Sequence, residues 1–348
     1  MNRRIANFLL PLLMMCFFCT FCNSSNSDGQ EINILQDIPV EEKNPVKYIT
    51  KTPDGVEFKR PLFIGYNKYD NNLYIADSEN HRIVILDVDL NYITQFGTKG
   101  KGPGEFDEPS GVAFTSKGDF VITDFNNRRI HIFGKDYKYI SHFKINLRLA
   151  SFYYVRTDSN DRIFANLPNR DSLFTVLNFD GDELEKFGEI FDYKYKNWLP
   201  EHNVAYYDFD KDYNLYCAFM NHAVFRKYDK DFNLVYEKDY SLLPPVQDQL
   251  KRWEKKIEER GGIEKYNGYL FKVFITCFSV DEKSLYINNS LDKYIYVFDK
   301  DNGTLTKKLF LHAPDIYGGV NIGHLFFDCS SQDYIYIIGS ALVAKFKK

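Results

Sequence analysis

Short runs of β-branched and aromatic residues, separated by Gly, Asn and Asp, recur along most of the chain. Between Phe96 and Phe133 a glycine-rich loop precedes three such runs, at 112–114, 120–122 and 130–133. Apolar runs broken by turn-forming residues are typical of short strands joined by tight turns. A single unit of this kind cannot bury both of its faces, so we expect it to repeat along the chain.

The unit does repeat. The second run of each unit follows a polar turn, and six such runs occur, at 72–75, 120–122, 162–164, 214–216, 284–287 and 334–337. A third apolar run follows each of them, and a fourth follows in the first five units. About four strands in each period of roughly 40–50 residues is the pattern of a propeller blade. The sequence therefore predicts an all-β, six-bladed β-propeller over residues 45–348.

The sixth unit lacks a fourth strand because the sequence ends at Lys348. An open ring would leave two sheet edges unpaired. The segment Val46–Thr50, just ahead of the first unit, has strand character and no obvious partner nearby. We predict that it forms the outer strand of the sixth blade and closes the ring.

The interval between the fourth and fifth units is longer than the others. Residues 244–262 begin with Pro-Pro and end with Gly-Gly, which are helix start and stop signals. Four apolar residues between them fall on one helical face: Val246, Leu250, Trp253 and Ile257. We predict a helical insertion between blades 4 and 5, and the sequence leaves open whether it packs on the propeller or serves as a lid or partner surface.

Residues 1–22 have the pattern of an export signal, in which Arg3 and Arg4 precede an apolar run. Cys22 stands where the chain turns polar, which resembles a bacterial lipoprotein signal, although Phe21 replaces the small residue expected there. The resemblance implies an acylated Cys22 and a lipid anchor in the outer membrane, on its periplasmic or surface face. A secretory signal without a lipid is the alternative. Residues 23–44 are predicted to be a flexible tether.

Composition narrows the possible functions. The 348 residues include 17% aromatics, with 31 Phe and 26 Tyr, which favours strands. A net charge of −4 with scattered basic residues argues against nucleic acid as a partner. The cysteines beyond the leader, Cys217, Cys277 and Cys329, match neither a disulfide framework nor a CxxC metal motif, and we expect buried thiols. No cofactor and no metal site is predicted.

The opening stretch resembles the NHL repeats, a family of six-bladed propellers. The glycine-rich loop leads into the motif D-x-x-N-x-R-I, which occurs in the first two blades through Asp77, Asn80 and Arg82 and through Asp124, Asn127 and Arg129. The later units keep the spacing of apolar runs and turns but lack the motif. With its leader, the chain resembles the propeller lipoproteins of the Bacteroides group. We expect the motif to be structural, with each carboxylate accepting backbone N–H bonds and pairing with the arginine.

The resemblance implies a site at the mouth of the central channel, where the innermost strands converge. Seven residues in or near predicted first strands are the candidates: Arg60, Tyr153, Arg156, His202, Tyr206, Lys272 and His324. Their side chains suit an anionic or sugar-like ligand, with the tyrosines as stacking partners. We expect a non-enzymatic binding module for a protein, peptide or glycan. Some NHL-like relatives are enzymes, so a metal-dependent lyase or hydrolase is the alternative, and a structural subunit of an envelope complex is a third reading.

Overall fold

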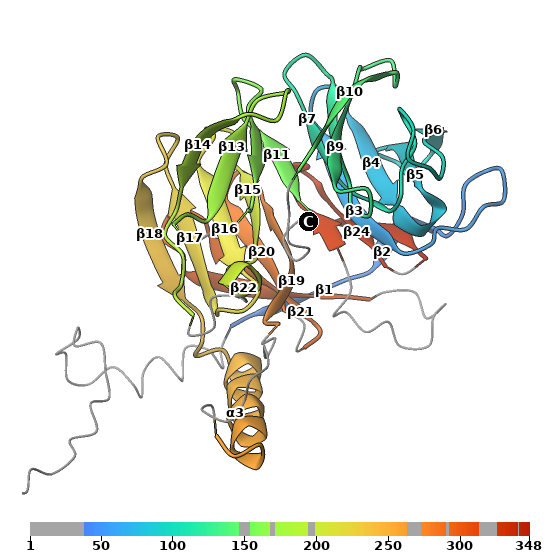
Figure 1. Cartoon of the computed structure of the whole chain (residues 1–348). Helices are drawn as coiled ribbons and strands as arrows, with labels where there is room; N and C mark the ends of the chain where they lie inside the picture. The colour runs from blue at the N-terminus through green and yellow to red at the C-terminus, as the bar shows by residue number, and fades with distance from the viewer. Residues whose placement is uncertain are drawn as a thin grey trace, which may run out of the picture. The chain divides into compact units, whose positions relative to one another are not determined.

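The structure is a computed structural model that describes residues 38–145, 154–167, 171–193, 199–262, 273–289, 292–312, 326–339 and 341–348. By its internal contacts the chain divides into residues 1–37, which lie outside the described residues, and a unit from Ile38 to Lys348. The strands of this second unit form six sheets around one axis (Figure 1). The predicted six-bladed β-propeller is confirmed. Among the described residues no helix has the length and hydrophobicity needed to cross a membrane.

In each blade the consecutive strands pair antiparallel, and the first of them is innermost. Blade 1 consists of β3 (Pro61–Asn67), β4 (Asn72–Asp77), β5 (Arg82–Asp87) and β6 (Tyr92–Phe96), with the short 3-10 helix η1 (Ser78–Asn80) between β4 and β5. Blade 2 consists of β7 (Pro109–Phe114), β8 (Phe120–Asp124), β9 (Arg129–Phe133) and β10 (Tyr139–Lys144). Blade 3 consists of β11 (Val155–Thr157), β12 (Ile163–Ala165), β13 (Phe174–Leu177) and β14 (Glu183–Phe187).

The last three blades follow the same order. Blade 4 consists of β15 (Ala205–Phe209), β16 (Leu215–Phe219), β17 (Val224–Tyr228) and β18 (Leu234–Asp239), and the short helix α2 (Leu199–His202) precedes it. Blade 5 contains β19 (Ile275–Val280), β20 (Ser284–Asn289), β21 (Tyr294–Asp299) and β22 (Leu305–Leu311). Blade 6 contains β23 (Phe326–Asp328), β24 (Tyr334–Ile338) and β25 (Val343–Lys347). The innermost strands β3 and β23 touch each other, so the last blade packs against the first.

Two N-terminal strands complete the last two blades. Strand β2 (Pro45–Ile49) pairs antiparallel with β25 and forms the outer strand of blade 6, which confirms the predicted closure. Strand β1 (Val40–Lys43) pairs in parallel with β22 and adds a fifth strand to blade 5. The expected tether of residues 23–44 is therefore wrong for residues 40–43. Their polar sequence, VEEK, lacks the apolar pattern of a strand. The strand is nevertheless held by backbone hydrogen bonds and by ion pairs of Glu41 with Lys43 and Lys307, both at 3.0 Å.

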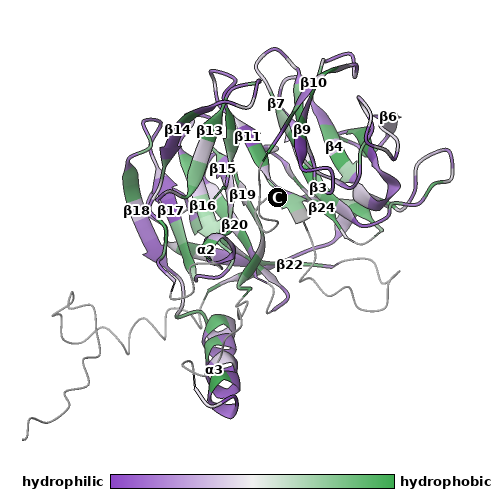
Figure 2. Ribbon diagram, viewed as in Figure 1, coloured by the Kyte–Doolittle hydropathy of each residue, from purple (hydrophilic) through white to green (hydrophobic). Residues whose placement is uncertain are grey.

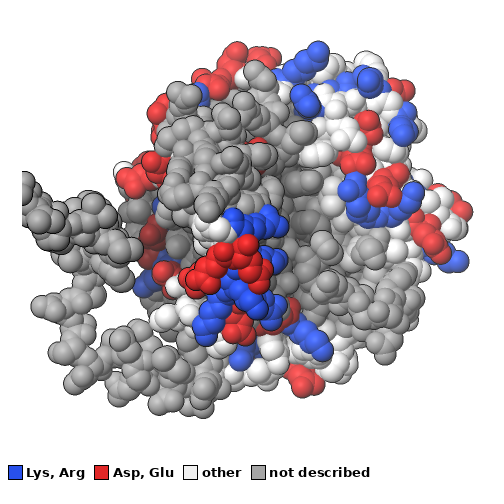
Figure 3. Space-filling view, turned by 60° about the horizontal axis from the view of Figure 1, so that its bottom comes forward, with Lys and Arg blue, Asp and Glu red and all other residues white. Residues whose placement is uncertain are grey.

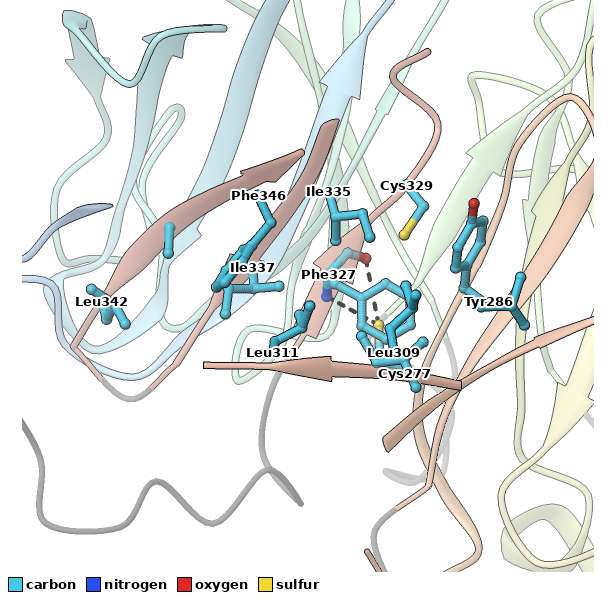
Figure 4. Close-up of a cluster of buried hydrophobic side chains, with 13 residues drawn as sticks. Cys277, Tyr286, Leu309, Leu311, Phe327, Cys329, Ile335, Ile337, Leu342 and Phe346 are labelled. Carbon is cyan, nitrogen blue, oxygen red and sulfur yellow. Dashed lines mark hydrogen bonds between the residues drawn. The ribbon is translucent and has the colours of Figure 1, made fainter. Parts of the chain in front are cut away.

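The middle strands of the blades are buried between neighbouring sheets. Every residue of β8, β9 and β16 is buried, whereas the outer strands β10 and β14 are largely half-buried or exposed. One apolar cluster joins blades 5 and 6 and includes Cys277, Phe327 and Cys329 (Figure 4). The three described cysteines are free and buried, as expected, and burial raises the pKa of the Cys277 thiol to about 12. These thiols therefore serve as core side chains.

Helix α3 (Pro244–Glu259) is the predicted insertion between blades 4 and 5. It ends before Gly261 and Gly262, whose positive φ angles suit glycine. The helix projects from the propeller (Figure 1), with hydrophobic residues along one side (Figure 2). Val246 and Ile257 on that side are buried. Lys and Arg alternate with Asp and Glu on the surface of this region (Figure 3), so the exposed side of α3 has no single sign of charge.

The D-x-x-N-x-R-I motif fastens the linker between blades 1 and 2. Asp124, at the end of β8, accepts hydrogen bonds from the N–H of Asp107 at 2.7 Å and from Asn127 and Arg129 at 2.8 Å each. The same two side chains donate to carbonyl oxygens of the glycine-rich linker, at Gly100 (2.9 Å), Lys101 (2.7 Å) and Glu105 (2.9 Å). The loop is therefore a structural connector, held by the blade that it enters.

Blade 1 uses the motif in the same way on the segment that enters it from β2. Asp77 accepts bonds from the N–H of Lys59 and from Asn80 and Arg82, each at 2.8 Å. Asn80 also donates to the carbonyl oxygen of Glu57 at 2.8 Å. In both blades a buried carboxylate thus ties the turn after the second strand to the incoming linker.

The buried carboxylates make stability sensitive to acid. Burial alone would raise the pKa of Asp124, but hydrogen bonds from His131, Asn127 and Arg129 outweigh it and lower the pKa. The pKa of Asp210 and of Asp281 is lowered in the same way, against the effect of burial, by Lys300 and Lys348 respectively. A carboxylate whose folded pKa lies below its unfolded pKa stabilises the fold above the unfolded value of about 3.9 and loses this effect as pH falls.

We therefore expect the melting temperature to fall as the pH is lowered from about 5 to about 3. A melting curve recorded at half-unit pH steps is the measurement. A melting temperature that stayed level or rose below pH 4 would contradict the assignment of these ion pairs.

Candidate functional site

A cavity of about 630 Å³ lies on the propeller axis, at the end of the ring where the innermost strands finish. All six blades line it, and one lining residue from each is Tyr66, Phe114, Arg156, Asp208, Asp281 and Asp328. We call it the axial cavity. Its walls come from strand ends and from the tight turns that follow them, so their positions are set by the sheets.

Aromatic rings fill the channel beneath the axial cavity. Tyr154, just before β11, packs against Phe63 of blade 1 and Tyr206 of blade 4, with ring centroids 6.3 and 5.0 Å apart. Its hydroxyl lies 4.0 Å from the sulfur of Cys277 in blade 5. A side chain of blade 3 that touches blades 1, 4 and 5 must lie near the axis, so the cavity has a floor. Gly65 makes room for this floor, because a Cβ there would lie 2.6 Å from the Phe63 ring.

An ion pair between blades 3 and 4 forms part of the floor. Arg156 donates through Nε to Asp208 Oδ1 at 2.8 Å and through Nη1 to the Val155 carbonyl oxygen at 3.1 Å. Burial disfavours the charged guanidinium, but Asp208 outweighs this and raises the pKa of Arg156. Among the described residues, Arg156 Nη2 has no hydrogen-bond acceptor and Asp208 Oδ2 has no donor. The pair therefore keeps one donor and one acceptor for a further partner.

Asp328 from blade 6 is the third charged group of the floor. Its Oδ1 accepts bonds from the N–H and hydroxyl of Ser330, at 2.7 and 2.6 Å. Its Oδ2 accepts one bond, from the N–H of Tyr66 at 2.9 Å. Burial raises the pKa of Asp328, and the nearby charge of Asp208 adds to this. A carboxylate oxygen can accept two hydrogen bonds, so Oδ2 has capacity for one more.

Two tyrosines meet across the mouth of the axial cavity. Tyr69 lies on the β3–β4 turn of blade 1 and Tyr213 on the β15–β16 turn of blade 4, and both line the axial cavity. The ammonium group of Lys68 is 5.3 Å from the Tyr69 ring centroid and 5.4 Å from that of Tyr213. Burial and the neighbouring Tyr213 raise the pKa of Tyr69 to about 12. Since blades 1 and 4 are opposite in a six-bladed ring, the contact spans the opening.

The charges around the axial cavity nearly cancel. Six carboxylates line it: Asp208, Asp210, Asp281, Glu282, Asp328 and Asp333. Lys68, Arg156 and Lys211 also line it, and Lys300 and Lys348 pair with Asp210 and Asp281 at 2.8 and 2.6 Å. Counting these two partners, five cations face six anions. The cavity is therefore polar without a strong preference for ligand charge.

The residues expected from the sequence are only partly brought together. Arg156 lines the axial cavity, and Tyr206 lies in the floor beneath it. Arg60 lies at the other end of the innermost strand, 47% exposed, and pairs with Glu79 and Glu108. His202, at the end of α2, stacks on Tyr193 at 4.4 Å. Tyr153, Lys272, His324 and the lipidation candidate Cys22 lie outside the described residues.

Four residues of the axial cavity were not predicted from the sequence: Asp208, Asp328, Tyr69 and Tyr213. The candidates predicted from the sequence are basic and tyrosine residues in or near the first strands, whereas the axial cavity lies where those strands end and turn. Acidic residues alternate at 208–212 in a hairpin turn, in which Asp210 accepts hydrogen bonds from the N–H groups of Asp212 and Asn214. All four residues lie at the end of an innermost strand or on the turn that follows it, so each strand end has to be considered together with its turn. Among the described residues no cluster of three His, Cys, Asp or Glu side chains is arranged to hold a metal ion.

The fold and its motif define an NHL-type six-bladed β-propeller with a floored cavity on its axis. The chain belongs to the DUF5128 family, described as a 6-bladed beta-propeller, whose model matches residues 28–337. Human NHL repeat-containing protein 3 is 31% identical over 84 residues, which cover 23% of this chain and 24% of that protein. The B-box type zinc finger protein ncl-1 of Caenorhabditis elegans is 49% identical over 45 residues, 13% of this chain and 5% of its own length. The chain thus spans about a quarter or less of these curated relatives.

Solved structures show the same fold at low sequence identity. The protein BF0058 from Bacteroides fragilis is 14% identical with a TM-score of 0.53, over 86% of this chain and 88% of that one. Virginiamycin B lyase from Staphylococcus aureus is 10% identical with a TM-score of 0.52, over 85% and 82% of the two chains. These similarities concern the fold alone.

Proposed function

We propose that this propeller is a binding module and that its ligand occupies the axial cavity. The observation that carries the proposal is the floor, where Arg156, Asp208 and Asp328 keep unused hydrogen-bonding capacity. Small-molecule sites are typically pockets of roughly 300–1,000 Å³ with a few convergent polar groups, and a volume of about 630 Å³ lies in this range.

The walls of the axial cavity support binding because they are already ordered. Lys300 holds the turn that carries Asp210, and Lys348 holds the turn that carries Asp281. These ion pairs join blade 4 to blade 5 and blade 5 to blade 6. A preformed site avoids the free-energy cost of ordering side chains and loops when the ligand binds.

Two turns of identical pattern in blade 4 provide a test with a matched control. Lys211 in D-K-D-Y-N lines the axial cavity, whereas Lys230 in D-K-D-F-N is exposed on the outer turn of the same blade. We expect Lys211→Trp to place an indole in the mouth and to reduce ligand binding at least tenfold. Lys230→Trp should leave binding unchanged.

The probes are a methyl pyranoside, the tripeptide Gly-Lys-Gly and citrate, which represent neutral, cationic and anionic ligands. A ligand at about 100 times its Kd stabilises a protein by roughly 2.7 kcal/mol, which thermal melting detects. We expect at least one probe to raise the melting temperature of the wild type and of Lys230→Trp, with a smaller effect on Lys211→Trp. Equal shifts in all three proteins, or no shift with any probe, would contradict binding in the axial cavity.

We further propose that the chain is exported and anchored through an acyl group on Cys22. The charged and apolar leader that ends at this cysteine supports the proposal. Cells that express the full chain should incorporate labelled palmitate into it, and Cys22→Ala should abolish the label. Labelling that persists in Cys22→Ala would exclude this residue as the anchor.

A further inference from the structure

We propose that the axial cavity recognises a neutral pyranose ring through a pair of adjacent hydroxyl groups. This inference rests on the proposed function and names the ligand class of the same site. Three features carry it: the hydrogen-bonding groups left open on the floor, the near balance of charge around the cavity, and the partly exposed aromatic rings in its walls.

Counted against the described residues, the open groups on the floor are one donor and two acceptors. Arg156 Nη2 is the donor, and Oδ2 of Asp208 and Oδ2 of Asp328 are the acceptors. The side chains of Arg156 and Asp208 are 16% and 15% exposed, so a ligand that enters the cavity can reach both. Charge-assisted hydrogen bonds of this kind are shorter and stronger than neutral ones.

A vicinal diol matches this set. Each hydroxyl donates one hydrogen bond and can accept others, so one hydroxyl can accept from Arg156 while both donate to the two carboxylates. A ligand carboxylate could accept from Arg156 but would meet Asp208 and Asp328 with the same sign of charge. A ligand ammonium could donate to both carboxylates but would leave the guanidinium N–H without an acceptor. The floor therefore discriminates in favour of a group that both donates and accepts.

The near balance of charge around the axial cavity also favours a neutral ligand. With Lys300 and Lys348 counted, six carboxylates face five cations, so the field favours neither a strongly anionic nor a strongly cationic ligand. Neutral polyhydroxylated molecules lose little in such an environment, because each desolvated hydroxyl finds a partner.

The walls supply apolar contact for the ring of a sugar. Tyr66, Phe114, Phe209 and Tyr334 line the cavity and are all half-buried, so part of each residue remains accessible. They come from blades 1, 2, 4 and 6 and therefore surround the floor on several sides. The C–H faces of a pyranose pack on aromatic rings, and Tyr hydroxyls can add hydrogen bonds at the edge.

The test uses the full chain and methyl α-D-mannopyranoside, methyl α-D-glucopyranoside and methyl β-D-galactopyranoside as probes, with binding measured by ligand-observed NMR titration. We expect at least one probe to bind. For that probe, analogues that lack one ring hydroxyl should include a pair of adjacent positions where removal weakens binding at least tenfold. The analogues test the floor without altering the protein.

Arg156→Lys tests the same contact from the protein side. Lysine keeps a positive charge beside Asp208, but its single nitrogen cannot replace both Nε, which donates to Asp208, and Nη2, which would donate to the ligand. We therefore expect binding to weaken at least tenfold. The melting temperature of the variant shows whether the fold is kept, and Lys230→Trp is the control that should bind as the wild type does.

The outcomes separate this inference from the proposed function. If Gly-Lys-Gly or citrate binds in a way that Lys211→Trp weakens, while no pyranoside binds, the cavity is a binding site and the sugar class is wrong. Suppose that a pyranoside binds with the same Kd to Arg156→Lys as to the wild type, and that its deoxy analogues bind the wild type as tightly as the parent sugar. In that case the floor does not recognise the hydroxyl groups, and the inference fails. If no probe binds in a manner that depends on Lys211, both proposals fail.

Discussion

Replacing Asp124 with alanine is expected to lower the free energy of unfolding by about 3–5 kcal/mol, the range found when one partner of a buried ion pair is removed. Asp124 is fully buried and accepts hydrogen bonds from Arg129, Asn127 and the N–H of Asp107. Without it, Arg129 keeps its charge at 5% exposure with only carbonyl oxygens as partners. Urea denaturation followed by tryptophan fluorescence measures the change.

A matched control lies in the same blade. Asp136 is an exposed carboxylate on a turn, paired with Lys138 at 2.8 Å. Exposed ion pairs contribute little to stability because solvent screens them, so Asp136→Ala should leave the free energy of unfolding almost unchanged. If the two variants lost equal stability, the network around Asp124 would not be the structural tie that the hydrogen bonds indicate.

Deleting residues 45–52 is expected to lower the melting temperature by many degrees. The deletion removes β2, which pairs with β25 from Pro45↔Phe346 to Ile49↔Val343 and is the outer strand of blade 6. Blade 6 would keep three strands, and the edge of β25 would be left without a partner. Each lost ladder hydrogen bond contributes about 1 kcal/mol, so the total is several kcal/mol.

Removal of residues before Pro45 is the control for this deletion. It takes away β1, which adds a fifth strand to the already complete blade 5. We expect a smaller fall in melting temperature than for the loss of β2, because no blade drops below four strands. A larger fall on loss of β1 would show that ring closure depends chiefly on blade 5.

The ring could be predicted from the sequence because each blade repeats a local pattern. Alternating turn residues and apolar runs mark the strands, and Val46–Thr50 was identified as the closing strand within one residue of its observed bounds. β1 was not predicted, because its four residues are mostly charged and are held by a partner more than 250 residues away. Local pattern cannot reveal a strand that depends on such a distant neighbour.

The candidate site was predicted less well than the ring, because it also depends on residues that are far apart in the sequence. Arg156 was identified, but its significance comes from Asp208, 52 residues further along, and from Asp328 in the last blade. Which hydrogen-bonding groups stay open depends on these contacts between blades, and the sequence does not show them. The scaffold motif was easier to interpret, because Asp124, Asn127 and Arg129 lie close together in the sequence and the carboxylate accepts hydrogen bonds from the other two side chains.

The most direct test of the account is a crystal structure of the chain grown with the methyl pyranoside that binds it most tightly. We expect the sugar to lie in the axial cavity, with adjacent hydroxyls within hydrogen-bond distance of Arg156 Nη2 and of Asp208 or Asp328. A sugar bound outside the axial cavity, with these three side chains as they are in the unbound structure, would contradict it.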